Sequence, residues 1–143
     1  MVQRHYPETP LLGVATAVWR GDKVLLVRRR AAPAAGLWAM AGGLVDLGET
    51  LGEAAKREVR EETRLEIEAP TFVTTNEIIL RDANDKVERH FVLAIHTAVS
   101  ASGLAVAGDD AAAVGWFTLE EALALPLAGR TAKLLPRTRD ALR

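Results

Sequence analysis

The sequence has no cysteine among its 143 residues. That absence excludes disulfide bridges, a thiol nucleophile and zinc held by thiolates, and it agrees with a reducing compartment. An excess of either charge is also missing, because the formal net charge is −1. A chain without a basic excess lacks the general electrostatic attraction to nucleic-acid polymers and anionic membranes. We therefore expect a cytoplasmic protein whose partners are neither nucleic-acid polymers nor membranes.

Long hydrophobic segments, repeats and low-complexity tracts are absent as well. The apolar run at residues 11–19 is too short to span a bilayer, and no small-residue cleavage site follows it. Apolar residues make up 49% of the chain, which is enough for a real core. The length and the lack of an obvious linker predict a single domain over residues 1–143.

The most informative stretch lies at residues 43–65. Thr50 and Glu53 form a T-x-x-E capping box, which predicts a helix beginning just after Thr50. On a wheel of about 100° per residue, one side of this helix is apolar. That side consists of Leu51, Ala54, Ala55 and Val59.

Acidic residues interrupt this apolar side. Glu58 and Glu62 fall in its middle and Glu61 at its edge, whereas Arg57 falls on the opposite side, where solvent is expected. Buried carboxylates need a partner or a metal ion, and all-oxygen ligands suit Mg²⁺ first and Mn²⁺ second. The alternative is a solvated helix end with ion pairs such as Arg57 with Glu61.

These residues resemble the signature of the Nudix hydrolases, G-x5-E-x7-R-E-U-x-E-E-x-G-U, in which U is aliphatic. The matching positions are Gly43, Glu49, Arg57, Glu58, Val59, Glu61, Glu62 and Leu65. Arg64 departs from the signature, because the family has glycine there. If the backbone after the helix is left-handed, arginine at this position should cost about 1 kcal/mol relative to glycine.

The resemblance implies an enzyme that hydrolyses a phosphoanhydride with the help of Mg²⁺ or Mn²⁺. By the same resemblance, Glu58, Glu61, Glu62 and the Gly42 carbonyl would bind the metal. Arg57 would orient the carboxylates, and Glu49 would hold Arg57 or reach a metal through water. The general base stays open between one of these glutamates and an acid from a loop.

Substrate-binding candidates lie outside the signature. Arg28 or Arg29, at the end of a predicted strand, would contact phosphate by resemblance, or else both are solvated. Trp38, in the lead-in G-L-W-A-M-A-G-G, either packs in the core or stacks on a base. The small-residue connector at residues 100–110 is the candidate mobile loop, and it ends in Asp109 and Asp110. By resemblance, an acid here would assist catalysis or bind another metal; the alternative is a loop acid in water.

The predicted fold class is α/β (α+β), an α/β/α sandwich of the Nudix type with a mixed sheet between helices. The order is strands at 11–19 and 24–28, a glycine loop at 36–43, the acidic helix, a hairpin at 72–80 and 87–99, and a strand at 113–117. A second capping box at Thr118 opens a helix ending near Pro126. The basic tail, residues 130–143, predicts a helix interrupted or started at Pro136, with a solvated face, phosphate attraction or a homodimer contact as alternatives.

Three functions are compatible with these residues. The preferred substrate is a small-molecule nucleotide, a nucleoside diphosphate linked to another group, such as ADP-ribose or a similar nucleotide sugar. The second alternative is an (oxidised) nucleoside triphosphate of the MutT type. The third is a sensor that binds nucleotides without hydrolysis, but such domains usually have damaged signatures, whereas here the acids and Arg57 are intact.

Overall fold

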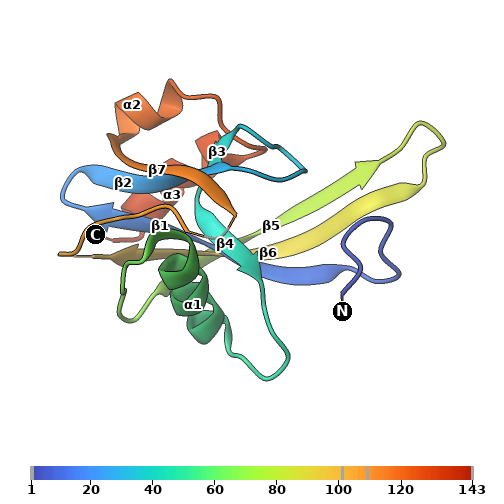
Figure 1. Ribbon diagram of the computed structural model, residues 1–143, viewed down its shortest axis with the longest axis horizontal. Coiled ribbons are helices and arrows are strands. Elements are labelled where there is room, and N and C mark those ends of the chain that lie inside the picture. Colours follow the sequence, from blue (N-terminus) through green and yellow to red (C-terminus); the bar gives the residue numbers. More distant parts are fainter. Residues whose placement is uncertain (1, 101, 109, 143) are drawn as a thin grey trace.

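The computed structural model describes residues 2–100, 102–108 and 110–142 (Figure 1). The strands are β1 (Leu11–Arg20), β2 (Lys23–Arg29), β3 (Trp38–Ala39), β4 (Ala41–Leu44), β5 (Thr71–Arg81), β6 (Val87–Val99) and β7 (Ala111–Thr118). The helices are α1 (Leu51–Thr63), between β4 and β5, and then α2 (Leu119–Leu123) and α3 (Thr131–Asp140) after β7. None of the described helices is long and apolar enough to cross a membrane.

Strand β1 is the centre of the mixed sheet. It pairs in parallel with β6 along nearly its whole length, and β6 pairs antiparallel with β5. The first half of β1 also pairs with β4, and its last residues pair with β2, which in turn pairs with β3 and β7. Both faces of β1 are covered, which explains why its sequence is a continuous apolar run instead of an alternation.

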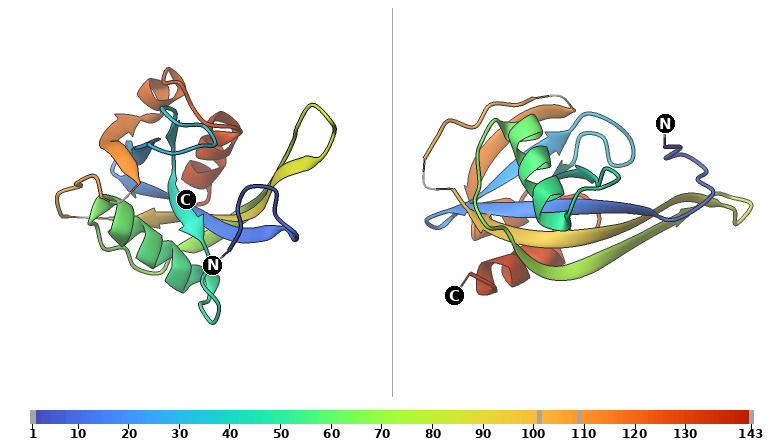
Figure 2. Two further views of the ribbon diagram at one scale, coloured as in Figure 1. Left: turned by 45° about the vertical axis from the view of Figure 1, so that its right-hand side comes forward. Right: turned by 90° about the horizontal axis from the view of Figure 1, so that it is seen from below.

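The helices cover opposite faces of the sheet, as Figure 2 shows for α1 and α3. Ala15, Ala17 and Trp19 pack with Leu134 and Leu135 of α3 on one face. The other face carries Val14 and Val18 of β1, with Ala54 and Val59 of α1. The predicted α/β/α sandwich is therefore confirmed.

Both predicted helix starts are confirmed by their hydrogen bonds. The Thr50 side chain accepts a hydrogen bond from the Glu53 N–H at 3.1 Å, and the Glu53 carboxylate accepts one from the Thr50 N–H. Thr118 and Glu121 form the same reciprocal pair at α2. Helix α1 ends at Arg64, which adopts a left-handed conformation with φ of 66°. The position at which the signature has glycine is therefore left-handed in this chain, with an arginine in it.

Two predictions for the secondary structure are wrong. The glycine loop at 36–43 instead contains β3 and β4, because β4 pairs with the half of β1 that β2 leaves open. The terminal helix neither starts nor stops at Pro136; it begins at Thr131 and continues through the proline. Proline removes only one backbone hydrogen bond, and burial of Leu134 and Leu135 holds the helix in place.

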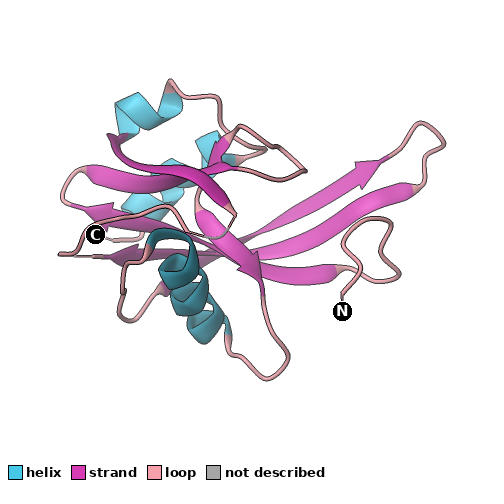
Figure 3. Cartoon of the chain, in the orientation of Figure 1, coloured by secondary structure: helices cyan, strands magenta, loops and turns pink. Residues whose placement is uncertain are grey.

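The β5–β6 hairpin extends well beyond the rest of the sheet, and the N-terminal arm before β1 lies close to it (Figure 3). The arm is attached to this hairpin by specific bonds. Tyr6 donates its backbone N–H to the Glu88 carbonyl at 2.8 Å and its hydroxyl to Asp82 at 2.7 Å. The His5 Nε2 lies 2.9 Å from the Glu88 carboxylate.

Candidate active site

Helix α1 lies against β4, and this contact places two glutamates over two glycines. A Cβ atom on Gly43 would lie 2.5 Å from the Glu58 carboxylate, so this position has room for the carboxylate only because it is glycine. A Cβ on Gly42 would collide with the Val14 carbonyl of β1. The glycine pair therefore serves two purposes, close strand pairing and space for acidic side chains.

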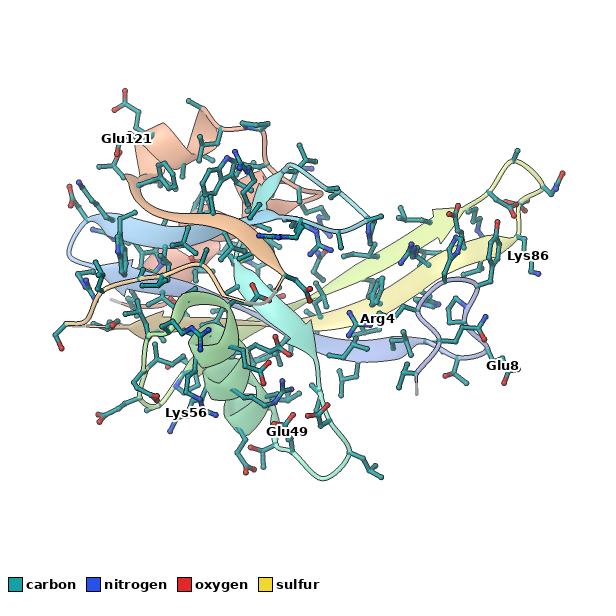
Figure 4. All side chains as sticks on the ribbon, in the orientation of Figure 1. Arg4, Glu8, Glu49, Lys56, Lys86 and Glu121 are labelled. Atoms are coloured by element: carbon teal, nitrogen blue, oxygen red, sulfur yellow. The ribbon has the colours of Figure 1, made fainter. Side chains whose placement is uncertain are left out.

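These side chains line a cavity of about 260 Å³. Six of the residues expected at the site line it, namely Gly42, Arg57, Glu58, Glu61, Glu62 and Asp110. The remaining lining residues are Arg4, Gly43, Leu44 and Asp46. Figure 4 shows Glu49 below this region, at the start of α1, and Arg4 near the end of β4.

Arg57 holds the acidic residues together. Its Nε and one terminal nitrogen donate to the two carboxylate oxygens of Glu49, at 2.7 and 2.9 Å. The other terminal nitrogen donates to Glu58 at 2.8 Å and to Glu61 at 3.3 Å. The guanidinium also donates to the Leu44 carbonyl at 2.9 Å. One side chain thus joins the loop before α1, the end of β4 and the acidic side of the helix.

The prediction that Arg57 faces solvent is wrong, because only 19% of its side chain is exposed. A helical wheel records the direction of the Cα–Cβ bond, whereas a long side chain leans back toward the helix N-terminus. That direction brings the guanidinium to Glu49 and to the end of β4. The ion pair of Arg57 with Glu61 does form, but within this network and not on a solvated face.

The same network keeps Glu49 ionised. Its hydrogen bonds with Arg57, and then with the Asp46 N–H, lower the pKa of Glu49 to about 2. The Glu49 contact in turn raises the pKa of Arg57, so the pair carries fixed, opposite charges at neutral pH. Glu49 is therefore held by Arg57, which is one of the two roles that the sequence left open.

Glu58 and Glu62 have raised pKa values for a shared reason. Burial raises the pKa of Glu58, although its hydrogen bond with Arg57 opposes the rise. Burial and the nearby Glu58 charge raise the pKa of Glu62 to about 8, against smaller opposing effects of the Gly42 N–H and Arg29. Two buried carboxylates without a compensating cation resist ionisation together. A divalent cation between them would remove this resistance.

The Gly42 backbone also faces the acidic cavity. The Val45 N–H donates to the Leu12 carbonyl of β1. Because the backbone groups of successive residues in an antiparallel strand point to alternate sides, those of Gly43 also point toward β1, and those of Gly42 point away from it. This direction agrees with the hydrogen bond between the Gly42 backbone and the Glu62 carboxylate. The Gly42 carbonyl shares this direction away from β1, and its role as a metal ligand stays a prediction.

The oxygen donors fit a hard divalent cation, although they do not form a closed cage. Among the described residues, no three acidic or histidine side chains are gathered closely enough to hold a metal ion on their own. Magnesium in particular is usually bound by one or two carboxylates, with water and substrate phosphates completing its shell. Glu58, Glu62 and Gly42 line the same cavity, which is compatible with such an open site.

The connector after β6 is fastened at both ends instead of lying free. Arg20 donates to the carbonyls of Ser100, Ser102 and Gly103 at 2.7–2.9 Å. Further along, the Val106 and Gly108 N–H groups donate to carbonyls in the last turn of α1, Thr63 and Glu62. This attachment places Asp110 at the acidic cavity. Asp109 falls outside the residues that the structure describes.

The predicted phosphate and base contacts are divided between two places. The charge of Arg29 acts on Glu62, so Arg29 lies near the acids, while its Nε donates to the Pro33 carbonyl. Arg28 instead lies 6.0 Å from the Trp38 ring, and Trp38 packs edge-on against Phe117 at 5.3 Å. Neither Arg28 nor Trp38 lines the acidic cavity, and their substrate contacts stay predictions.

Sequence reasoning missed Arg4 and Asp46. Arg4 belongs to an arm without periodicity, and only the folded chain brings the arm to the end of β4. Beside the acidic cavity lies a larger one, of about 700 Å³, and Arg4, Leu44 and Asp46 line both. No spacing in the sequence connects the arm with the signature, which begins nearly forty residues later at Gly43.

Comparison with known families decides the classification. The NUDIX domain model matches residues 9–138. The chain belongs to the Nudix family. The matched segment contains all the strands and helices given above except the last residues of α3. The fold and the residues of the glutamate signature therefore lie within one match.

Individual Nudix relatives support this assignment. An ADP-ribose pyrophosphatase of Methanocaldococcus jannaschii is 31% identical over 110 residues, which cover 77% of this chain and 63% of that protein. The crystal structure of a MutT NUDIX hydrolase from Burkholderia pseudomallei has a TM-score of 0.79 and 32% identity, and the match covers 91% of this chain and 98% of that one. The NUDIX domain of Shewanella oneidensis NrtR, solved with ADP ribose, has a TM-score of 0.81 and 26% identity, covering 95% and 90%.

Other relatives are matched over a smaller part. An NAD-capped RNA hydrolase, NudC of Edwardsiella ictaluri, is 37% identical over 73 residues, which cover 51% of this chain and 28% of that protein. The chain therefore spans less than two thirds of the length of these two curated relatives.

Proposed function

We propose that this Nudix protein is a pyrophosphohydrolase that cleaves a phosphoanhydride in a nucleoside diphosphate linked to another group, with Mg²⁺ or Mn²⁺ as cofactor. ADP-ribose or a similar nucleotide sugar is the preferred substrate. The observation that carries the proposal is the intact set of Glu58, Glu62 and Arg57 in one cavity with the Gly42 backbone. Residues 1–143 would carry this activity as one domain.

Glu58, Glu62 and the Gly42 carbonyl would hold the metal, with Glu61 at the rim of the same cavity. The bound ion would supply charge neutralisation for the phosphoanhydride and acidify water in its shell. Arg57 keeps Glu58 oriented through the 2.8 Å hydrogen bond, and Glu49 fixes Arg57 from the other side. A carboxylate not engaged with the ion, Glu61 or Asp110 of the same cavity, would accept the proton of the attacking water.

The preference for a linked diphosphate rests on the space around the acids. A diphosphate with two substituents needs room on both sides of the scissile bond, whereas a triphosphate needs one base pocket. The acidic cavity adjoins the larger one at Arg4, Leu44 and Asp46, so room exists beyond the glutamates. The named activity of the archaeal relative and the ADP ribose bound to the Shewanella domain support the same substrate class.

A substrate panel tests the proposal. ADP-ribose, sugar nucleotides, NADH, diadenosine polyphosphates and 8-oxo-dGTP are compared by kcat/KM with Mg²⁺, with Mn²⁺ and with excess chelator. We expect ADP-ribose to lead and chelator to abolish turnover of every substrate. Turnover that persists in chelator contradicts the mechanism. A lead of tenfold or more for 8-oxo-dGTP, about 1.4 kcal/mol in transition-state binding, favours the MutT-type alternative.

That alternative has support of its own, because the Burkholderia relative is a MutT protein and matches nearly its whole length. The nucleotide-sensor alternative makes a different prediction, which is binding without turnover in every metal. Glu62→Gln separates enzyme from sensor: we expect turnover to fall by about 10² or more, the scale of a lost acid–base group, while a sensor has no turnover to lose.

A further inference from the structure

Two arginines, Arg4 of the N-terminal arm and Arg89 of β6, lie in the space beside the glutamates. Arg4 lines both cavities, and Arg89 of β6 lines the larger one. Neither guanidinium takes part in an ion pair or a side-chain hydrogen bond with any residue in the described part of the chain. Their donors therefore remain available to a ligand. Arginine presents these donors as a planar fork that suits phosphate oxygens and flat rings.

The position of Arg4 is fixed by hydrogen bonds of the neighbouring residues in the arm. The next two residues of the arm, His5 and Tyr6, are bonded to Glu88 and Asp82 of the hairpin. Gln3 adds hydrogen bonds to the carbonyls of both, at 2.9 and 3.0 Å. Lys86 lies 4.9 Å from the Tyr6 ring. These contacts hold the arm across the end of β4, so Arg4 stays between the two cavities.

The larger cavity has the chemistry of a nucleobase site. Val2, Val45 and Leu47 are its apolar lining residues, of which Val2 and Leu47 are exposed, and Arg89 brings hydrogen-bond donors. Its volume of about 700 Å³ falls in the range of small-molecule sites, which are mostly apolar with a few polar groups that fix orientation. A further phosphate would meet the Asp46 carboxylate as well as Arg4 and Arg89, whereas a flat heterocycle can use the apolar lining and the Arg89 guanidinium together.

We propose that the arm completes the substrate site: Arg4 binds the diphosphate where it leaves the glutamate cavity, and the cavity between the arm and Arg89 binds the nucleobase. This assignment rests on the proposed function, since it places the nucleoside half of the same substrate. Arg4 lines both cavities, so a chain of groups running from one cavity into the other would pass beside it. The other half of the substrate then lies on the Asp110 side of the glutamates.

Two non-hydrolysable probes test the assignment in the presence of Mg²⁺. α,β-Methylene-ADP carries the diphosphate and the base, whereas methylenediphosphonate carries only the diphosphate. Binding to the wild type, Arg4→Ala and Arg89→Ala is measured by calorimetry, with Arg137→Ala, on the exposed side of α3, as the matched control. Circular dichroism melts check that each variant is folded.

We expect Arg4→Ala to weaken both probes by about tenfold or more, the effect of losing a charge-assisted hydrogen bond. Arg89→Ala should weaken α,β-methylene-ADP by about tenfold and leave methylenediphosphonate unchanged, and Arg137→Ala should change neither. If Arg89→Ala weakens both probes equally, the larger cavity is an anion site and the nucleobase assignment is wrong. If both probes bind Arg4→Ala and Arg89→Ala as they bind the wild type, and the wild type hydrolyses nucleotides, the role of the arm is wrong but the proposed function stands. A wild type that neither binds nor hydrolyses nucleotides overturns the proposed function with it.

Discussion

Replacing Glu62 by glutamine should change how stability depends on pH. In the folded, metal-free protein the pKa of Glu62 is about 8, against an ordinary value of 4.5. Between these values the folded carboxyl keeps its proton while the unfolded one has lost it. The folded state therefore binds more protons, and the free energy of unfolding falls as pH rises from about 4.5 to about 8. Glutamine cannot ionise, so Glu62→Gln escapes this loss.

The size of the effect follows from the pKa difference. Each pKa unit corresponds to about 1.36 kcal/mol, so the full shift would give up to a few kcal/mol. Allowing for the part of the side chain that reaches solvent, we expect about 3 kcal/mol at pH 8. The substitution also removes the repulsion between the Glu58 and Glu62 charges, which raises the pKa of Glu62, and this further increases the stability of Glu62→Gln relative to the wild type. At pH 4.5 the ionisation of Glu62 should contribute little to the difference in free energy of unfolding between the two proteins.

The measurement is urea unfolding followed by circular dichroism, in excess chelator, at pH 4.5, 6, 7 and 8. Glu66→Gln is the matched control, because Glu66 is exposed and lies just beyond the same helix. The stability gain of Glu62→Gln should grow with pH, while that of Glu66→Gln should stay constant. A gain for Glu62→Gln that does not vary over this range would refute the reasoning. Adding Mg²⁺ at pH 8 should stabilise the wild type more than Glu62→Gln, since only the wild type keeps both carboxylates.

Four further substitutions probe the site and the end of its helix. Arg57→Ala removes the group that pairs with Glu58, so we expect a loss of about 2 kcal/mol in urea unfolding, and a fall in turnover of at least tenfold. Arg64→Gly relieves a left-handed arginine, so it should raise stability by about 1 kcal/mol in the same assay and leave turnover within about tenfold. Gly43→Ala should displace only the Glu58 carboxylate, lowering turnover with little change in melting temperature, whereas Gly42→Ala meets a backbone oxygen of β1 and should lower the melting temperature. Equal melting temperatures for the two glycine variants would contradict the geometry.

Local patterns in the sequence predicted the elements well, because their causes are local. The two capping boxes begin helices at the residues expected, and the β5–β6 hairpin and the buried β1 follow from periodicity and composition. The placement of Glu58 and Glu62 toward the sheet follows from the wheel alone. The sequence left open whether Arg64 adopts a left-handed backbone, and the structure shows that it does.

The failures have causes that lie outside the local sequence. Strand β4 exists because β1 has an edge that β2 covers only in part, and no spacing within residues 36–43 encodes that edge. Arg57 turns inward because Glu49 and the Leu44 carbonyl lie within its reach in the fold. Arg4 comes to the site through an arm attached to a distant hairpin. In each case the position of a partner element, and not the residue's own pattern, decides the outcome.

Metal binding should release a proton from the site, because its acidic residues differ in pKa. Glu49 stays ionised beside Arg57, with a pKa of about 2, whereas Glu62 forms no ion pair with a residue in the described part of the chain and has a pKa of about 8. At pH 7 the metal-free site therefore holds nearly one extra proton on Glu62. A divalent cation needs the ionised carboxylate, so its binding should expel that proton. Calorimetric titration with Mg²⁺ in two buffers of different ionisation enthalpy counts the protons released. We expect about one at pH 7, almost none at pH 9.5, and none at either pH in Glu62→Gln. Release of a full proton by Glu62→Gln at pH 7 would mean that another group, and not Glu62, carries it.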